Sequence, residues 1–437
     1  MSQTVLPNSI NYNEVLPSLS PQTQNFTQVL QPVNGSIFGP NQQIYVDIPS
    51  RGFIDPQSIY IRYKMNITVG ANTANSAILA CPVYAPFARV ETYINSQQVD
   101  SIQDYNVVAH SWSNLFLGVN EKYGNQYGFA YRDTTAAATT LDELDGRDLV
   151  ELATGTTTSF FASAPLVCTK LTSCEKFIPA FATGGIRLIF TLDTYTNMFS
   201  LALSAATTAA ATNITNFELV YDMIDFGPEV EQSILSQPSI MIKSNGYANS
   251  AVTVPASQSG TMTLVYNQRF ASIRSAIVLP SGSAVNLKTI NGKFDAVDIT
   301  TGGSYSLNVG GVTFPQGGPI SFANNKAGAM SELRKATGNL YDWSKSMAIN
   351  NIEFNYVDND STSLNQPGKV YVGFDLNKIN SASKNMLNGT SSQNSPINLT
   401  LTIATPMGTA AKNVYLILNY DCVFIIDPRT KMITLNQ

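Results

Sequence analysis

The chain has 437 residues, of which 44% are hydrophobic and only 13% are charged, and its formal net charge is −5 at pH 7. This length exceeds the size at which a single core usually divides, so two domains are expected. The acidic balance argues against a surface that neutralises nucleic-acid phosphates, and no apolar run reaches the roughly 18–20 residues of a membrane-spanning helix. The first residues lack the basic start and apolar core of a signal peptide, so synthesis in the cytoplasm is expected.

The first 32 residues predict an extended arm rather than a domain. They contain four prolines and no basic residue, and their apolar residues are scattered. Such a segment cannot bury a core of its own. Alternating apolar positions begin at Ile44 and again at Ile59, which predicts two half-buried strands joined by a turn near residues 50–56.

Residues 87–101 predict a strand, an Asn-Ser turn and a second strand. A helix over residues 103–117 should follow, because apolar residues share one face at helical spacing, and its two large aromatic residues, Trp112 and Phe116, are expected to be buried. Residues 121–158 show little periodicity and predict a long external loop.

The second half predicts the same order of elements. Strands are expected over residues 261–266 and 272–279, followed by a strand, a Gly-Gly turn and another strand over residues 305–314. A helix is then expected over residues 326–340. Strand, tight turn, strand and helix therefore occur in both halves.

Two pairs of similar segments indicate a tandem repeat. Residues 217–226 resemble residues 416–425, with Tyr-Asp at the centre of both, and Tyr221 and Tyr420 are 199 residues apart. Residues 186–192 resemble residues 397–403 in the same alternating phase, at an offset of 211. The larger offset places a longer loop in the first copy, at the Ala/Thr-rich residues 201–215. These patterns predict an all-β protein with two similar domains.

Candidate catalytic residues are few. The single histidine, His110, lies beside the apolar face of the predicted helix, so a structural role is favoured over a catalytic one. No nucleophile elbow, phosphate-binding loop or His-Glu-x-x-His motif occurs, so we predict no enzyme activity, no catalytic or cofactor-binding residue and no cofactor.

The cysteines favour buried free thiols over a disulfide framework, because they are few and scattered. The closest two also lack the second pair, or the nearby histidine, that a zinc site would need. The four positions are Cys81, Cys168, Cys174 and Cys422.

One acidic cluster leaves a metal site open. Carboxylates at short spacing in a loop are ligands that calcium prefers. The cluster lacks the Asp-x-Asp-x-Asp-Gly spacing and includes Arg147, so a solvated loop is the favoured interpretation and no metal site is predicted. Its members are Asp142, Glu143, Asp145 and Asp148.

Four segments, in order, resemble the double jelly-roll major capsid proteins of the lineage that includes adenovirus, the lipid-containing tailless phages, virophages and polinton-like viruses. Each motif is mostly apolar alternation with a turn, so their order, the duplication and the chain length carry the resemblance. The acidic loop and the Ala/Thr-rich loop match nothing in that family. The segments are residues 53–56 (Phe-Ile-Asp-Pro), 90–96 (Val-Glu-Thr-Tyr-Ile-Asn-Ser), 177–188 (Phe-Ile-Pro leading into Gly-Gly-Ile-Arg-Leu) and 419–427 (Asn-Tyr-Asp-Cys-Val-Phe-Ile-Ile-Asp).

The resemblance implies two tandem eight-stranded jelly-roll β-sandwiches with short inserted helices and long surface loops. The expected boundaries are an N-terminal arm over residues 1–32, a first jelly roll over 33–230 and a second over 231–437. The implied function is a viral major capsid protein, located in the virion, whose homotrimers form pseudo-hexagonal capsomers that tile an icosahedral shell.

The resemblance also implies partners. These are neighbouring capsomers, minor capsid or penton proteins and, as in many members of the family, an internal membrane. Residues 1–50 contain no Lys, Arg or His, so direct nucleic-acid binding is not expected. The alternative is a secreted glycan-binding or adhesin-type β-sandwich protein. The missing signal peptide and the short junction at residues 227–238 weigh against it.

Overall fold

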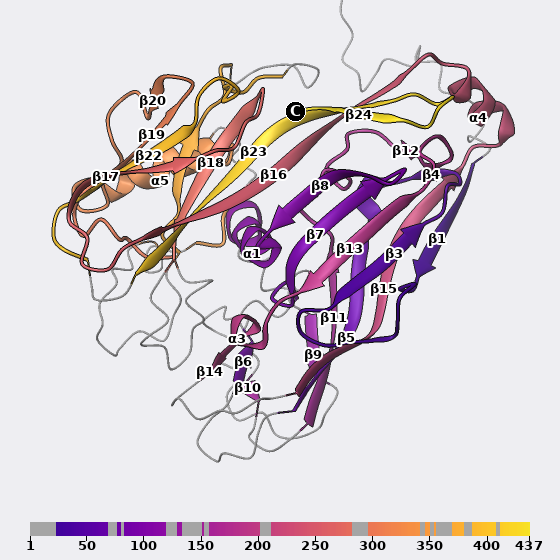
Figure 1. Ribbon diagram of the computed structural model, residues 1–437, viewed down its shortest axis with the longest axis horizontal. Coiled ribbons are helices and arrows are strands. Elements are labelled where there is room, and N and C mark those ends of the chain that lie inside the picture. Colours follow the sequence, from indigo (N-terminus) through magenta and orange to yellow (C-terminus); the bar gives the residue numbers. More distant parts are fainter. Residues whose placement is uncertain are drawn as a thin grey trace, which may run out of the picture.

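The computed structural model describes residues 23–68, 77–79, 83–118, 129–132, 151–152, 157–201, 211–281, 296–340, 346–349, 354, 369–379, 387–407 and 411–437. Antiparallel strands in this part of the chain form two sandwiches that lie side by side (Figure 1). No helix among these residues is long and apolar enough to cross a membrane.

The first sandwich consists of two facing sheets, A and B, and a small third sheet, C. Sheet A contains β1 (Gln24–Leu30), β2 (Ile37–Phe38), β4 (Phe53–Ile54), β5 (Tyr60–Thr68), β9 (Phe129–Arg132), β11 (Thr157–Pro165), β12 (Ile178–Pro179) and β15 (Ala211–Asp225). Sheet B contains β3 (Gln43–Ile48), β13 (Ile186–Leu192), β7 (Phe87–Ile94) and β8 (Gln97–Gln103). Sheet C contains β6 (Ala77–Leu79), β10 (Glu151–Leu152) and β14 (Phe199–Leu201).

The second sandwich consists of sheets D and E. Sheet D contains β16 (Ile240–Val254), β23 (Lys412–Ile426), β18 (Ile273–Pro280), β21 (Val372–Asp375) and β24 (Ile433–Asn436). Sheet E contains β17 (Gly260–Tyr266), β22 (Ile397–Ile403), β19 (Ser304–Val309) and β20 (Val312–Phe314). Helices in the described residues include α1 (Tyr105–Phe116), α3 (Tyr195–Met198), α4 (Pro228–Leu235) and α5 (Lys326–Ala336), with 3-10 turns η2 (Pro56–Ser58) and η3 (Ala180–Ala182).

The strand order makes both sandwiches jelly rolls. If the eight principal strands of each sandwich are numbered along the chain, one sheet holds the first, eighth, third and sixth, as in β1-β15-β5-β11 and β16-β23-β18-β21. The other sheet holds the second, seventh, fourth and fifth, as in β3-β13-β7-β8 and β17-β22-β19-β20. Two Greek keys folded onto each other produce this order. The predicted fold class, an all-β double jelly roll, is therefore confirmed.

The repeat seen in the sequence has a structural counterpart. β13 and β22 are the seventh strands of the two sandwiches, and β15 and β23 are the eighth strands. A helix follows the fifth strand in both, α1 after β8 and α5 after β20. Both predicted turns are also present: Asn95, Ser96, Gly310 and Gly311 all have positive φ, as a two-residue hairpin turn requires.

Aromatic rings fill the centre of the first sandwich. Tyr63 of β5 and Phe217 of β15 come from sheet A, whereas Phe87 of β7 and Phe190 of β13 come from sheet B. Ring centroids lie 5.5 Å apart for Tyr63 and Phe87, 5.6 Å for Phe87 and Phe190, and 5.1 Å for Phe190 and Phe217. All four residues are buried, and such offset and edge-on contacts stabilise a core beyond the area they bury.

The predicted N-terminal arm is wrong over residues 24–30. They form β1, the first strand of the first jelly roll, and pair with β15 from Gln24↔Asp225 to Leu30↔Leu219. β1 is an edge strand that exposes most of its residues. Its stability comes from backbone hydrogen bonds rather than from a buried face, so the segment carries no apolar alternation.

Other features differ from the prediction or add to it. The predicted loop at residues 121–158 contains β9, β10 and the start of β11, and residues 211–215 of the Ala/Thr-rich loop belong to β15. The junction at residues 227–238 contains α4, which has no buried residue. Trp112 and Phe116 are half-buried and stack on each other, with ring centroids 6.1 Å apart.

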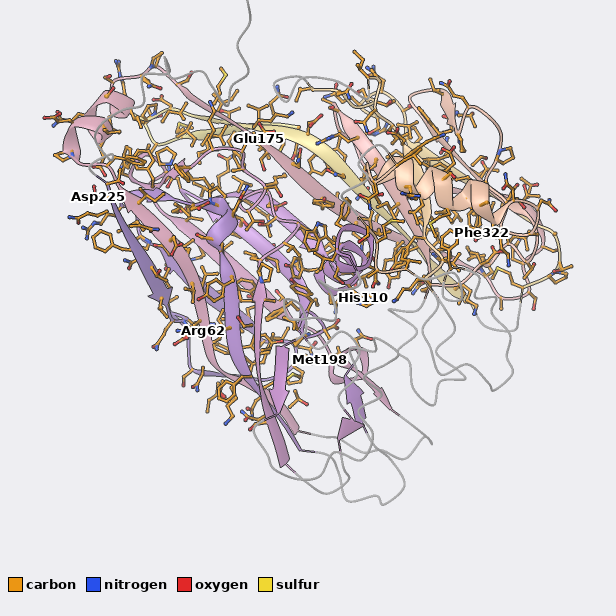
Figure 2. The ribbon with its side chains drawn as sticks, turned by 180° about the vertical axis from the view of Figure 1, so that it is seen from behind. Arg62, His110, Glu175, Met198, Asp225 and Phe322 are labelled. Atoms are coloured by element: carbon orange, nitrogen blue, oxygen red, sulfur yellow. The ribbon has the colours of Figure 1, made fainter. Side chains whose placement is uncertain are left out.

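The strands of the first sandwich run between two ends of that sandwich. Sheet C, built from segments between principal strands of the first sandwich, lies at one end, and α4 lies at the opposite end (Figure 1). Figure 2, which shows the molecule from behind, places Met198 near the sheet C end and Asp225 near the α4 end. The inserted strands of sheet C therefore lie together at one end of the first sandwich.

Candidate functional site

The candidate residues from the sequence do not converge. His110 is buried in α1, where its Nε2 atom lies 3.2 Å from the side-chain nitrogen of Asn114. Within the described residues, no group of three or more His, Cys, Asp and Glu side chains could hold a metal ion. The acidic cluster at residues 142–148 lies outside the described residues, so the calcium alternative is untested. The structural role of His110 also remains a prediction.

Three of the four cysteines are described, and all three are free and buried, as predicted. Cys81 lies outside the described residues. Burial raises the pKa of the Cys168 and Cys174 thiols and raises the pKa of Cys422 to about 12. These thiols therefore stay protonated at neutral pH, which makes them unreactive.

One hollow of the described surface has a volume of about 540 Å³ and lies beside the start of α5. Its lining is rich in glycine and asparagine. The one ionisable side chain in that lining, Glu332, is 2.6 Å from Lys335 Nζ. The described lining therefore contains no neighbouring acid and base that could exchange a proton with a substrate.

A buried ion pair lies where the two sandwiches meet. Asp100 of β8 is 4% exposed and Lys170, which lies between β11 and β12, is 3% exposed. Lys170 Nζ lies 3.9 Å from Asp100 Oδ1 and donates hydrogen bonds to Val99 O at 2.8 Å and to Gln437 Oε1 at 2.6 Å. The other Asp100 oxygen accepts a hydrogen bond from the Lys170 backbone N–H at 2.8 Å. Buried Asp and Lys residues are rare unless they are paired in this way.

Burial shifts the pKa of both groups toward the neutral form. It raises the pKa of Asp100 to about 6, although the nearby Lys170 charge opposes the shift. Burial also lowers the pKa of Lys170, and Asp100 opposes that change. The two charges are therefore costly to bury separately and depend on each other in the folded state.

The second sandwich closes over this pair. The Lys170 ammonium lies 5.4 Å from the ring centroid of Tyr420 on β23, and that ring stacks on Phe270 at 3.8 Å. The Ser244 hydroxyl of β16 donates a hydrogen bond to the Lys170 carbonyl. Gly246 of β16 leaves room for the ring, because a Cβ atom there would lie 2.4 Å from Tyr420. We call Asp100, Lys170, Ser244 and Tyr420 the seam.

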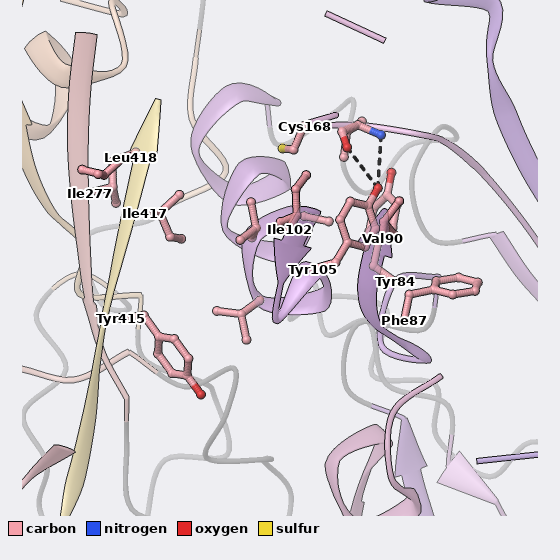
Figure 3. Close-up of a cluster of buried hydrophobic side chains, with 14 of the residues drawn as sticks. Tyr84, Phe87, Val90, Ile102, Tyr105, Cys168, Ile277, Tyr415, Ile417 and Leu418 are labelled. Atoms are coloured by element: carbon pink, nitrogen blue, oxygen red, sulfur yellow. Dashed lines mark hydrogen bonds between the residues drawn. The ribbon is translucent and has the colours of Figure 1, made fainter. Parts of the chain in front are cut away.

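A second set of contacts joins α1 to the second sandwich. Asn114 donates a hydrogen bond to the Tyr371 hydroxyl at 2.9 Å, and Asn339 donates one to the Leu115 carbonyl at 3.2 Å. The Ala348 N–H bonds to the Asn114 carbonyl at 3.0 Å. Figure 3 shows α1 flanked on one side by the core of the first sandwich and on the other by β23. The two sandwiches therefore share one continuous hydrophobic cluster.

The seam and the α1 contacts give the two sandwiches a fixed arrangement. Flexibly tethered modules would expose these groups, whereas here they are buried and hydrogen-bonded. Sequence reasoning used Tyr420 only as a marker of the repeat and missed Asp100, Lys170 and Ser244. A signal was present, because Lys170 follows the run Leu-Val-Cys-Thr, and a lone lysine near apolar residues suggests a buried partner.

Comparison with known proteins identifies the fold but no sequence relative. No protein-family model matches the chain, and no curated protein matches its sequence. The Faustovirus major capsid protein matches with a TM-score of 0.58 and 10% identity, over 96% of this chain and 93% of that chain. A chain of the PBCV-1 virus capsid matches with a TM-score of 0.56 and 13% identity, over 98% and 99%.

The mavirus major capsid protein has a TM-score of 0.53 and 12% identity, over 100% of this chain and 96% of that chain. The matches extend across both sandwiches, and all three are double jelly-roll major capsid proteins. At such low identity the likeness concerns the fold. The chain thus has the double jelly-roll fold of these viral major capsid proteins.

Proposed function

We propose that the protein is a viral major capsid protein that acts as a structural building block of the virion without catalysis. One observation carries the proposal: two jelly rolls of identical strand order are held side by side by a buried seam. Three copies of such a chain present six similar units around a three-fold axis. A homotrimer can therefore act as a pseudo-hexagonal capsomer and tile an icosahedral shell.

The rigid seam supports this function. A capsid lattice requires the same angle between the two jelly rolls in every subunit, because small differences in this angle would add up over many capsomers. The alternative, a secreted glycan-binding or adhesin-type protein, has less support, since independent binding modules are usually joined by flexible tethers. We place the jelly rolls at residues 24–226 and 240–437. Residues 1–22 of the predicted arm lie outside the described residues.

The assembly proposal predicts a trimer. The purified protein should have about three times the 47.3 kDa mass of one chain in light scattering at micromolar concentration, because a closed interface of standard size gives stable association. Electron microscopy should show hexagonal capsomers or shells. A monomer at that concentration would count against the proposal, and a monomer that binds sugars would favour the alternative.

We also propose that the genome does not contact this protein directly, and that minor capsid or penton proteins and an internal membrane are its other partners. The trimer should show no gel shift with DNA or RNA at physiological salt, because a net charge of −5 per chain repels phosphates. The titration should be repeated at low salt. Tight binding that weakens steeply as salt rises would contradict the prediction.

A further inference from the structure

The outer face of sheet E is a regular array of small uncharged side chains. Three residues from each of β17, β22 and β19 point away from the core and lie in register across the sheet. We call this array the E face. In rows across the three strands it consists of Thr261, Thr402 and Ser304, then Thr263, Thr400 and Ser306, then Val265, Asn398 and Asn308.

The E face is open to solvent yet carries no charge. Thr261, Thr263, Val265 and Thr402 are exposed, and the other members are half-buried. The four strands of sheet E contain no Asp, Glu, Lys or Arg at any position. The paired threonine hydroxyls lie 3.5 Å apart in two rows. A solvent-facing sheet usually carries charged side chains that keep it soluble and unpaired.

The equivalent face of the first jelly roll, formed by the same nine positions, carries charged side chains. We call it the B face. Arg187 and Asp47 form two hydrogen bonds there, at 2.6 and 2.8 Å, and Arg89 lies 3.3 Å from Glu91. Its rows are Gln43, Thr191 and Arg89, then Tyr45, Ile189 and Glu91, then Asp47, Arg187 and Tyr93. Equivalent faces of the two jelly rolls are therefore charged in the first and uncharged in the second.

The charge on a face determines how much desolvation free energy its burial costs. Desolvating an exposed ion pair such as Arg187 and Asp47 is costly, and the buried centres of protein interfaces are depleted of charged residues. The outer face of sheet A also carries an ion pair, between Arg62 and Glu218, and α5 packs on β18 and β21 of sheet D. Of the four outer sheet faces, the E face is the one that is both open and uncharged in the described chain.

We propose that the E face is the surface through which one copy of this chain contacts a second copy. The inference rests on the proposed self-assembly and names its surface. Each copy has a net charge of −5, so contact through an uncharged face avoids repulsion between like charges. A nucleic-acid partner would require basic side chains on the E face. A lipid surface would require more large apolar side chains than Val265 alone.

Two matched substitutions test this surface. Thr402 of β22 and Thr191 of β13 occupy the same position in the two sandwiches. Thr402 lies in the first row of the E face, and Thr191 lies in the first row of the B face. Thr402→Glu should raise the concentration at which half of the oligomer dissociates by about tenfold or more, because a buried carboxylate opposes association. Thr191→Glu should change it by less than about twofold. Light scattering over a dilution series gives the mass, and thermal melting by circular dichroism shows whether each variant folds.

A labelling experiment covers the case in which Thr402→Glu does not fold. Thr263 and Tyr45 are also equivalent positions, and each can be replaced by cysteine in a Cys81→Ser background. Maleimide labelling at position 263 should be about tenfold slower in the oligomer than in dilute monomer, whereas labelling at position 45 should not change. An oligomer that is indifferent to Thr402→Glu and labels freely at position 263 would overturn the E face while leaving the capsid proposal intact. A parent chain that is monomeric would overturn both.

Discussion

Replacing Lys170 by methionine should lower the free energy of unfolding by about 3–5 kcal/mol, because the change leaves the Asp100 carboxylate buried without its cation. The methionine keeps most of the volume, so the loss reports the charge and its hydrogen bonds to Val99 and Gln437 rather than a cavity. Chemical denaturation followed by circular dichroism at fixed protein concentration measures the effect.

An exposed ion pair provides the control for Lys170→Met. Arg187 donates hydrogen bonds to Asp47 at 2.6 and 2.8 Å, closer than the 3.9 Å between Lys170 and Asp100, but its side chain and that of Asp47 are 51% and 42% exposed. Arg187→Met should cost no more than about 1 kcal/mol, because solvent screens an exposed pair. Equal losses for the two variants would show that the seam does not stabilise the junction between the jelly rolls.

The same site predicts a pH dependence of unusual sign. The pKa of Asp100 is raised from its ordinary value of 3.8 to about 6, mainly by burial. Between these values the folded chain binds a proton that the unfolded chain has released, so the contribution of Asp100 to stability is complete below the lower value and is lost as pH rises through the upper one. Relative to Asp100→Asn, the parent should therefore gain stability as pH falls from 7 to 4. A difference that stays constant over this range would contradict the shift.

Sequence patterns predicted the elements whose stability comes from a buried face. Ile186, Leu188, Phe190 and Leu192 alternate strictly and form β13, and the Asn-Ser and Gly-Gly turns have the positive φ that their residue types allow. Elements without such a face were missed. β1 is an edge strand held by β15, and α4 packs none of its residues into a core.

The place of Lys170 after an apolar run was the one local signal for the seam, and it did not identify the partners of Lys170. Asp100 and Lys170 are 70 residues apart, and their partners Ser244 and Tyr420 come from the other sandwich. Only the packing of the two jelly rolls removes these side chains from water, so their pairing is a tertiary property. The lack of charge in β17, β22 and β19 can be read from the sequence, but their assembly into one E face becomes visible only when the three strands are placed in register.

Gly303→Ala should cost more than about 3 kcal/mol and reduce the soluble yield, because a Cβ atom at this position would lie 1.6 Å from the backbone oxygen of Thr402. A backbone atom cannot turn aside as a side chain does. The added methyl group must therefore push β19 away from β22 and break the pairing that begins at Ser304↔Thr402.

Gly317→Ala is the matched control for this change, since nothing lies within 4 Å of a Cβ atom there. It should change the free energy of unfolding by no more than about 0.5 kcal/mol. Because Thr402 and Ser304 share a row of the E face, Gly303→Ala should also weaken association of whatever protein remains folded. A variant with the midpoint and oligomeric mass of the Gly317→Ala protein would show that β19 and β22 are not packed as closely as the structure indicates.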